Sequence, residues 1–172
     1  MARMSSRDAI ALLKADHRKV EELFGQFERA KAKSRKKTLA DQICLELSVH
    51  TKIEEDVFYK GCREEGVDEA LMNEAYVEHD GAKVLVREIE KGDPNDEYYD
   101  AQVKVLSEMI KHHVKEEEKK QGNMFAKAKK AGVDTDALGR QMAAEKRKLT
   151  AEFKANGLPK PPTPTFRGTQ LA

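Results

Sequence analysis

The sequence has no tryptophan and only two cysteines, Cys44 and Cys62, among its 172 residues. Two cysteines form neither a disulfide framework nor a metal-binding thiol cluster, so we expect buried thiols without a function, with a redox-sensor role as the alternative. No apolar run reaches the length that spans a bilayer, and the first residues, MARMSSRDAIALLKAD, lack the apolar stretch of a secretory signal. We therefore expect a cytoplasmic protein without a membrane partner.

An excess of charge of one sign is also absent. The chain has 32 Lys and Arg against 31 Asp and Glu, which gives a formal net charge of +1. This balance gives no electrostatic reason to expect nucleic acid as a partner. Hydrophobic residues make up 39% and charged residues 37% of the chain. The regular spacing of the hydrophobic residues favours a helical bundle with a narrow core over a disordered chain.

Strand-like alternation is scarce, and apolar residues recur at helical spacing along most of the chain. Ser5 and Asp8 offer a cap for the first helix. Glycine and proline mark the later connections, and the basic run KAKSRKK around Ser34 is predicted to be a solvated turn. We predict helices over residues 6–31, 38–60, 68–91, 96–131 and, shorter, 135–155.

Long helices joined by short connections predict an all-α fold, an up-down-up-down four-helix bundle with a short extra C-terminal helix and an extended tail. The expected parts are the bundle over 1–132, the appended amphipathic helix over 133–156 and a Pro-rich flexible tail over 157–172. Four prolines between positions 159 and 164 predict that the tail is extended or mobile.

Histidine is scarce as well, with five residues in all, and its placement is informative. One histidine falls within the apolar stripe of each bundle helix. The spacing of the apolar residues before the adjacent His112 and His113 selects His113 as the inward one. Glu54 and Glu117 each follow an inward histidine by four residues, so each lies on the same helix face as that histidine. The inward set is His17, His50, Glu54, His79, His113 and Glu117.

A single inward histidine is usually a hydrogen-bonded core residue, and a lone His-x-x-x-Glu pair is usually a surface ion pair. Four inward histidines on four helices are hard to explain separately. Burying four imidazoles and two carboxylates with nothing between them would cost several kcal/mol or force large pKa shifts. Metal coordination removes this cost, and mixed histidine and carboxylate ligands are typical of non-haem iron or manganese in bundle cores.

The motifs ADHRKVEELF, HTKIEEDVFY, EHD and HHVKEEE resemble those of the hemerythrin-like, HHE cation-binding family over about residues 7–150. The resemblance implies a bundle around two non-haem iron ions with an oxo or hydroxo bridge; manganese would use the same ligands. It implies that one iron is bound by His17 and His50 and the other by His79 and His113. The two carboxylates, Glu54 and Glu117, would bridge the ions.

One departure from the family pattern concerns a fifth histidine, which oxygen-carrying hemerythrins have one turn from the third-helix ligand. Here Lys83 stands four residues after His79 and Ala75 four residues before it. The second iron would then either keep an open or water-filled position or take a ligand such as Tyr76 or Glu78. By analogy, the low histidine count resembles the sensing and redox branches of the family more than dedicated oxygen carriers.

The surroundings of the inward set give further expectations. Glu21 and Lys83 have equivalent positions on two helices expected to run parallel, which suggests either an ion pair beside the site or two separately solvated side chains. We expect Phe24, Phe58 and Ile110 to be ordinary core residues. They would also enclose a dry pocket that limits access to small molecules.

Three functions remain open at this point. The first is a diiron-binding protein that binds or senses O2, NO or peroxide, or responds to iron. The second is a diiron enzyme with peroxidase-like, catalase-like or NO-reducing activity, although the sequence shows no acid–base pair beyond the ligands and Tyr76. The third is a metal-responsive interaction module whose C-terminal segment contacts a protein partner.

Overall fold

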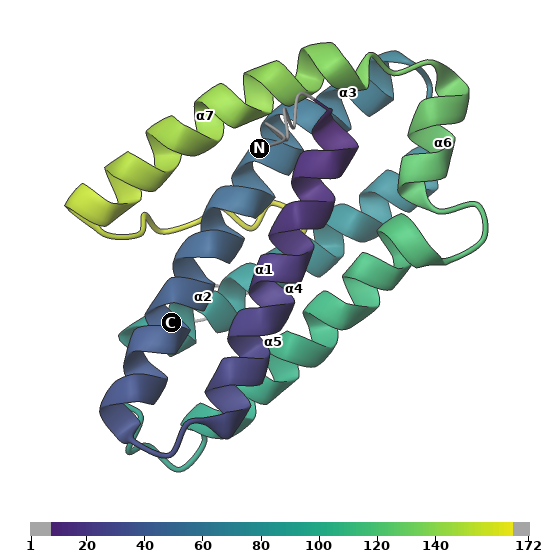
Figure 1. Cartoon of the computed structure of the whole chain (residues 1–172). Coiled ribbons are helices and arrows are strands. Elements are labelled where there is room, and N and C mark those ends of the chain that lie inside the picture. The colour runs from purple at the N-terminus through teal and green to yellow at the C-terminus, as the bar shows by residue number, and fades with distance from the viewer. Residues whose placement is uncertain (1–7, 167–172) are drawn as a thin grey trace, which may run out of the picture.

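The computed structural model describes residues 8–166, and within that range it contains helices and connections but no strand. Four helices form the predicted bundle: α1 (Ala9–Arg29), α2 (Lys33–Ile53), α4 (Glu69–Lys91) and α5 (Tyr99–Val114) (Figure 1). Each packs against two others, in the order α1, α2, α4, α5 and back to α1. In the described part of the chain, no helix has the length and apolar character to cross a membrane.

Side-chain caps fix several helix starts. Asp8 accepts a hydrogen bond from the backbone N–H of Ala11 at 2.8 Å and so begins α1. Asp68 and Asn123 cap α4 and α6 (Met124–Ala131) in the same way. The other predicted cap, Ser5, lies outside the described residues.

The predicted start of the second helix is wrong. The helix begins at Lys33, five residues earlier than expected, so Ser34 lies inside it and not in a turn. Charge alone does not break a helix, because Lys and Arg are good helix formers. The basic side chains are also paired here: Lys36 forms an ion pair with Asp100, and Lys37 pairs with Asp41 at 2.7 Å.

The prediction of one continuous helix over 96–131 is also wrong. After α5 the chain passes through the π-helical turn η2 (Lys115–Lys119), breaks, and resumes as α6. Gly122 takes a left-handed conformation with φ 68° at the break, which glycine adopts without strain. The second bundle helix has a matching feature, because α2 continues through the π-helical turn η1 (Glu54–Phe58) into α3 (Tyr59–Glu64).

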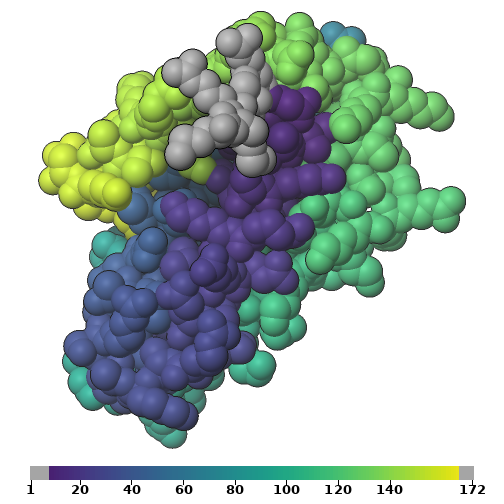
Figure 2. Space-filling view, viewed as in Figure 1, coloured from purple at the N-terminus to yellow at the C-terminus, as the bar shows by residue number. Residues whose placement is uncertain are grey.

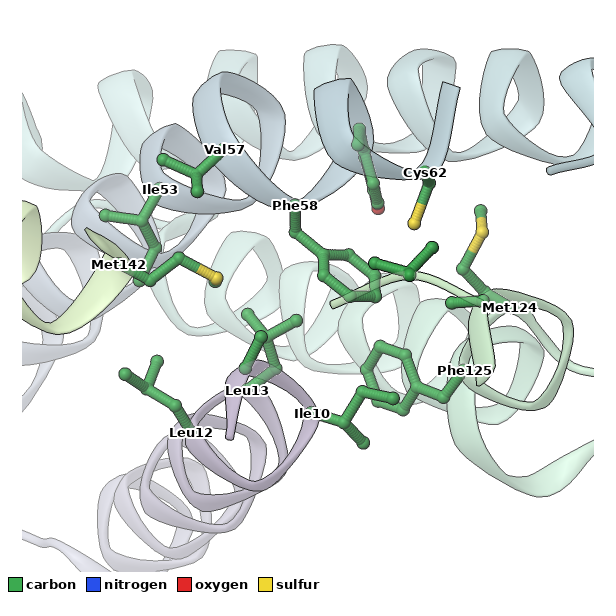
Figure 3. Packing of buried hydrophobic residues seen from close by; sticks show 14 of the residues in the cluster. Ile10, Leu12, Leu13, Ile53, Val57, Phe58, Cys62, Met124, Phe125 and Met142 are labelled. Carbon is green, nitrogen blue, oxygen red and sulfur yellow. The ribbon is translucent and has the colours of Figure 1, made fainter. Parts of the chain in front are cut away.

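The apolar core consists of two clusters stacked along the bundle. The first joins the start of α1 to η1, α3, α6 and α7, and includes Leu13, Phe58 and Phe125 (Figure 3). The second fills the other end of the bundle and includes Phe24 and Leu106. The inward histidines lie in the helix segments between these clusters.

The C-terminal segment packs on the bundle. Helix α7 (Thr135–Asn156) crosses α1 and α2 and buries Met142, Leu149 and Phe153; with 22 residues it is as long as the bundle helices and not short (Figures 1 and 2). The chain then turns back through residues 157–163, which have no regular secondary structure, and forms a turn at 164–165. It is held on α4, because the N–H and hydroxyl of Thr165 both donate to Asp80, at 2.9 and 2.7 Å.

Candidate metal centre

Six ionisable side chains meet in the bundle interior between the two core clusters. None of them is more than 5% exposed to solvent. They are the predicted inward set: His17 of α1, His50 of α2, His79 of α4, His113 of α5, Glu54 of η1 and Glu117 of η2. A buried polar cluster of this size is costly unless its members find partners.

The histidines form two pairs. The ring centroids of His17 and His50 lie 4.9 Å apart, and those of His79 and His113 lie 4.6 Å apart. In the second pair the two Nε2 atoms face each other at 3.1 Å. Two imidazole lone pairs at that distance repel each other unless a proton or a metal cation lies between them.

The two glutamates lie between the histidine pairs. Glu117 spans them, with Oε1 3.3 Å from Nε2 of His113 and Oε2 3.5 Å from Nε2 of His17. The Oε2 atom of Glu54 lies 3.3 Å from Nε2 of His50 and 3.4 Å from Nε2 of His79. Both carboxylates therefore face one member of each pair, which is the placement a bridging ligand needs.

Both glutamates belong to the π-helical turns, Glu54 in η1 and Glu117 in η2. A π turn inserts one extra residue into a helix, and such turns recur at functional sites because they redirect side chains. Neither stretch contains proline, the usual cause of an interrupted helix. The two interruptions thus coincide with the two His-x-x-x-Glu motifs.

Several atoms at the centre lack a hydrogen-bond partner although they are buried. They are Nε2 of His17, Nε2 of His50, both carboxylate oxygens of Glu54 and Oε2 of Glu117. A buried acceptor without a partner costs about 1–3 kcal/mol, and more when it is charged. Nitrogen and carboxylate oxygen are suitable ligands for iron or manganese, so the residues present fit a bound metal cation.

Each histidine points its other ring nitrogen, Nδ1, at a carboxylate from a neighbouring segment. The pairs are His17 with Glu118 at 3.2 Å, His50 with Asp16 at 3.4 Å, His79 with Glu55 at 3.0 Å and His113 with Glu78 at 2.7 Å. A proton on Nδ1 leaves the Nε2 lone pair free for a metal, and the carboxylate raises the basicity of the ring. All four Nε2 atoms are thereby prepared as ligands.

A basic group lies beside each of these orienting carboxylates. The pairs are Arg18 with Glu118, Lys146 with Asp16, Lys83 with Glu55, and His112 with Glu78. Through the contact of Lys146 with Asp16, helix α7 helps to hold the histidines in place. Sequence reasoning missed Asp16, Glu55 and Glu118, although each directly precedes or follows a member of the inward set, and this adjacency was the available signal.

Tyr59, also missed, is a fully buried neighbour of the centre. Its hydroxyl donates a hydrogen bond to Oε1 of Glu117 at 2.7 Å, and its ring stacks on His79 with the centroids 5.5 Å apart. Burial, together with the carboxylate of Glu117, raises the pKa of Tyr59 well above its usual value. The phenol therefore stays protonated and serves as a fixed donor.

The suggested ion pair between Glu21 and Lys83 is wrong. Lys83 binds Glu55 at 2.8 Å and Asp80 at 2.9 Å. Glu21 is 57% exposed and pairs with Arg18 at 3.3 Å on its own helix. Helical periodicity predicts which way a side chain points from its own helix. It does not predict that Glu55 of η1 and Asp80 of α4 lie nearer to Lys83.

The two residues suggested as replacements for a fifth histidine point elsewhere. Glu78 accepts a hydrogen bond from Nδ1 of His113, on the side of that ring opposite its Nε2 atom. Its other carboxylate oxygen lies near His112. Tyr76 sets its ring against Tyr59, at 5.2 Å between centroids, and against the guanidinium of Arg63. Glu78 therefore acts as an orienting group, and Tyr76 packs behind the centre.

The predicted apolar neighbours are distributed over both clusters. Phe58 packs edge-on against Phe125 of α6, which in turn stacks parallel to the ring of His17 at 6.2 Å. Phe24 is buried in the second cluster. Ile110 lines the cavity described below.

The buried carboxylates of the metal centre favour positive charge between them. Although burial lowers it, the pKa of His50 is raised to about 10 by the carboxylates of Glu54 and Asp16. Although burial raises it, the pKa of Glu54 is held well below its usual range by the neighbouring histidines. Burial, with the added charge of His50, lowers the pKa of His17 to about 3, so its ring stays neutral. Without a bound cation the anionic carboxylates therefore keep a proton on His50, while His17 stays neutral, so the middle of the centre is a place for positive charge.

A cavity of about 440 Å³ opens onto the histidines. Its walls come from α1, α2, α4 and α5, from α7 and from the returning C-terminal segment. The apolar part includes Val20, Leu47, Val86 and Phe153. Pro159 and the following residues to Pro162 close one side.

Comparisons with known proteins identify the domain family and the fold. The family model of the hemerythrin HHE cation-binding domain matches residues 8–125. A solved crystal structure, of a hemerythrin HHE cation-binding domain-containing protein from Mycobacterium kansasii, matches with a TM-score of 0.73 and 19% identity. The match covers 88% of this chain and 94% of that chain. At this identity the likeness shows the fold alone. No curated protein matches the sequence.

Proposed function

Because this chain belongs to the hemerythrin HHE cation-binding domain family, we propose that it binds two non-haem iron ions and uses them to bind or sense O2, NO or peroxide. The observation that carries the proposal is the set of partnerless buried atoms on His17, His50, Glu54 and Glu117. These atoms converge with the facing Nε2 atoms of the second histidine pair. Iron ions bound there would supply the electrons for small oxidants.

The proposed ligands divide by histidine pair. His17 and His50 would hold one ion, His79 and His113 would hold the other, and the carboxylates of Glu54 and Glu117 would be shared between them. The distances between these groups support the division, since each glutamate lies within 3.5 Å of a histidine from each pair.

The surrounding residues hold the ligands in place. The orienting carboxylates keep the proton of each imidazole on Nδ1, so that Nε2 faces the metal. Tyr59 fixes the orientation of Glu117 by its hydrogen bond. Lys83, at the place of the missing fifth histidine, is held by Glu55 and Asp80. Lys83 would therefore not serve as a ligand to the second ion.

Reduction of peroxide at the same centre is the second candidate function. The cavity favours it, because it gives peroxide a path to the histidines. An interaction module that uses the C-terminal segment receives less support, since α7 buries Leu149 and Phe153 against the bundle. We also propose a cytoplasmic location, which the two unpaired cysteines favour.

The neighbouring histidines provide a direct test. His113→Ala removes a proposed ligand that is buried, whereas His112→Ala changes a side chain that is 59% exposed. After anaerobic loading with ferrous iron, we expect His113→Ala to lose bound iron and the optical change produced by NO, while His112→Ala, which loses a contact with Glu78 but no proposed ligand, keeps most of both. Equal iron content and equal spectra in the two variants would overturn the proposal.

A further inference from the structure

The cavity is larger than the proposed gases or hydrogen peroxide require. Its volume is about 440 Å³. A water molecule takes about 30 Å³ in the liquid, and the diatomic gases and hydrogen peroxide are of comparable size. Pockets that hold organic ligands have volumes of about 300–1,000 Å³. The space beside the histidines is therefore of the size that an organic molecule fills.

The wall of the cavity is apolar over its middle part. Val20, Leu47, Ala82 and Val86 line it on the bundle side. Leu149 and Phe153 of α7 line it on the opposite side, and both are buried. Charged residues also line the cavity, but the larger part of its surface is apolar, as in many small-molecule sites.

The charged groups on the wall are largely paired with each other. Lys83 is bound by Glu55 and Asp80, and Lys52 binds Asp56 at 2.9 Å. A ligand with a net charge would therefore find few unpaired partners in the interior of the cavity. An uncharged ligand meets no such obstacle.

The C-terminal segment completes the site. Residues from Pro159 to Pro162 form part of the wall, and the hydrogen bonds from Thr165 to Asp80 fix the segment beyond them. Lys83 also donates to the backbone carbonyl of Pro162 at 3.4 Å. These contacts hold the prolines against the cavity.

We propose that this cavity binds an uncharged organic molecule with an apolar body and one oxygen-bearing end, such as an organic hydroperoxide or the corresponding alcohol. The apolar body lies between Val86 and Phe153. The oxygen-bearing end lies at the histidines, and this orientation rests on the proposed function of the metal centre. The fit of the apolar body depends only on the cavity.

The test uses 2-phenyl-2-propanol, an unreactive alcohol, as the probe, and measures its binding to the full-length iron-loaded protein by calorimetry. Val86→Phe fills the cavity, and Val105→Phe makes the same change on the exposed surface, where Val105 is 52% exposed. We expect saturable binding to the natural sequence, a loss of affinity of about tenfold or more in Val86→Phe, and no loss in Val105→Phe. Iron content is measured on each sample and should be equal in all three.

A second variant covers the case in which Val86→Phe does not fold. Ala82→Leu places an aliphatic side chain, which suits a helix, at another point of the same wall, and it should also weaken binding of the probe. Absence of saturable binding to the natural sequence, or equal affinity in the cavity variants and Val105→Phe, would overturn the inference. If the protein takes up no iron but still binds the probe, the metal function fails and the cavity site stands, so the two failures are distinguishable.

Discussion

Lys146 of α7 donates a hydrogen bond to Asp16 of α1, and this ion pair joins the C-terminal helix to the support of the metal centre. The other carboxylate oxygen of Asp16 faces Nδ1 of His50. Helix α7, which follows the matched family domain, therefore supports a histidine of the metal centre through Asp16.

Asp16→Asn should weaken iron binding while the protein stays folded. The amide cannot act as an anionic acceptor for His50, and loss of such a partner typically lowers metal affinity by about 10- to 100-fold. A competition titration of ferrous iron against a chelator measures the change. Asp56→Asn is the matched control, since Asp56 pairs with Lys52 at a position that is 46% exposed. Unchanged affinity in Asp16→Asn would contradict the orienting role.

Tyr59→Phe should destabilise the metal-free protein by about 1–3 kcal/mol. The change removes the donor to Glu117 and leaves a buried carboxylate oxygen without its hydrogen bond. Urea unfolding monitored by circular dichroism gives the free energy of unfolding. Tyr76→Phe serves as the control, because Tyr76 contacts the ring of Tyr59 and not the carboxylate. Equal losses in the two variants would mean that the hydrogen bond to Glu117 contributes little.

The two thiols predict a pH dependence of stability. Burial raises the pKa of Cys44 and of Cys62 from 9.0 to about 12. Between these values the unfolded chain releases thiol protons that the folded protein retains, so the free energy of unfolding falls as pH rises; below pH 9 both states keep them. For one thiol the fall between pH 8 and 10 is about 1 kcal/mol.

Cys44→Ala isolates this contribution. The difference in free energy of unfolding between the natural sequence and the variant should shrink by about 1 kcal/mol from pH 8 to pH 10. Urea unfolding of the metal-free proteins at the two pH values measures the difference. A difference that stays constant over this range would show that the folded protein does not hold the Cys44 thiol neutral.

Iron should stabilise the folded chain, because the unfolded chain lacks the assembled ligands. A metal present at about 1,000 times its dissociation constant adds about 4 kcal/mol to the free energy of unfolding. Differential scanning calorimetry with and without ferrous iron measures the shift, and addition of a chelator should reverse it. The shift should be lost in His113→Ala and kept in His112→Ala. An equal shift in both variants would indicate that iron binds elsewhere.

Helical periodicity predicted the interior of this protein well. The apolar spacing before the adjacent histidines placed His113 inward and His112 at the margin. In the structure the side chain of His113 is 5% exposed and that of His112 is 59% exposed. The phase of a residue on its own helix follows from its own sequence, which is why this choice could be made without a structure.

Contacts between helices could not be predicted in the same way. Glu55 supports His79, and Glu118 supports His17, across gaps that depend on the relative height and rotation of two helices. The suggested pairing of Glu21 with Lys83 failed for this reason. The π-helical turns that carry both glutamates leave no simple mark in composition or periodicity.

The C-terminal segment shows a further limit. Its prolines predicted an extended or mobile segment; residues 157–163 have no regular secondary structure, and a turn follows at 164–165. Its docking on Asp80 depends on a buried carboxylate more than 80 residues earlier in the chain, as the hydrogen bonds of Thr165 show. No local pattern in a Pro-rich sequence identifies such a partner.

The number of iron ions bound by each chain tests the central claim most directly. Anaerobic titration with ferrous iron, followed by removal of free metal and analysis of bound metal, should saturate at about two ions per folded chain. A variant with both His79→Ala and His113→Ala keeps the pair His17 and His50, and it should saturate at about one. Saturation of the natural sequence at one ion or fewer would contradict the dinuclear centre.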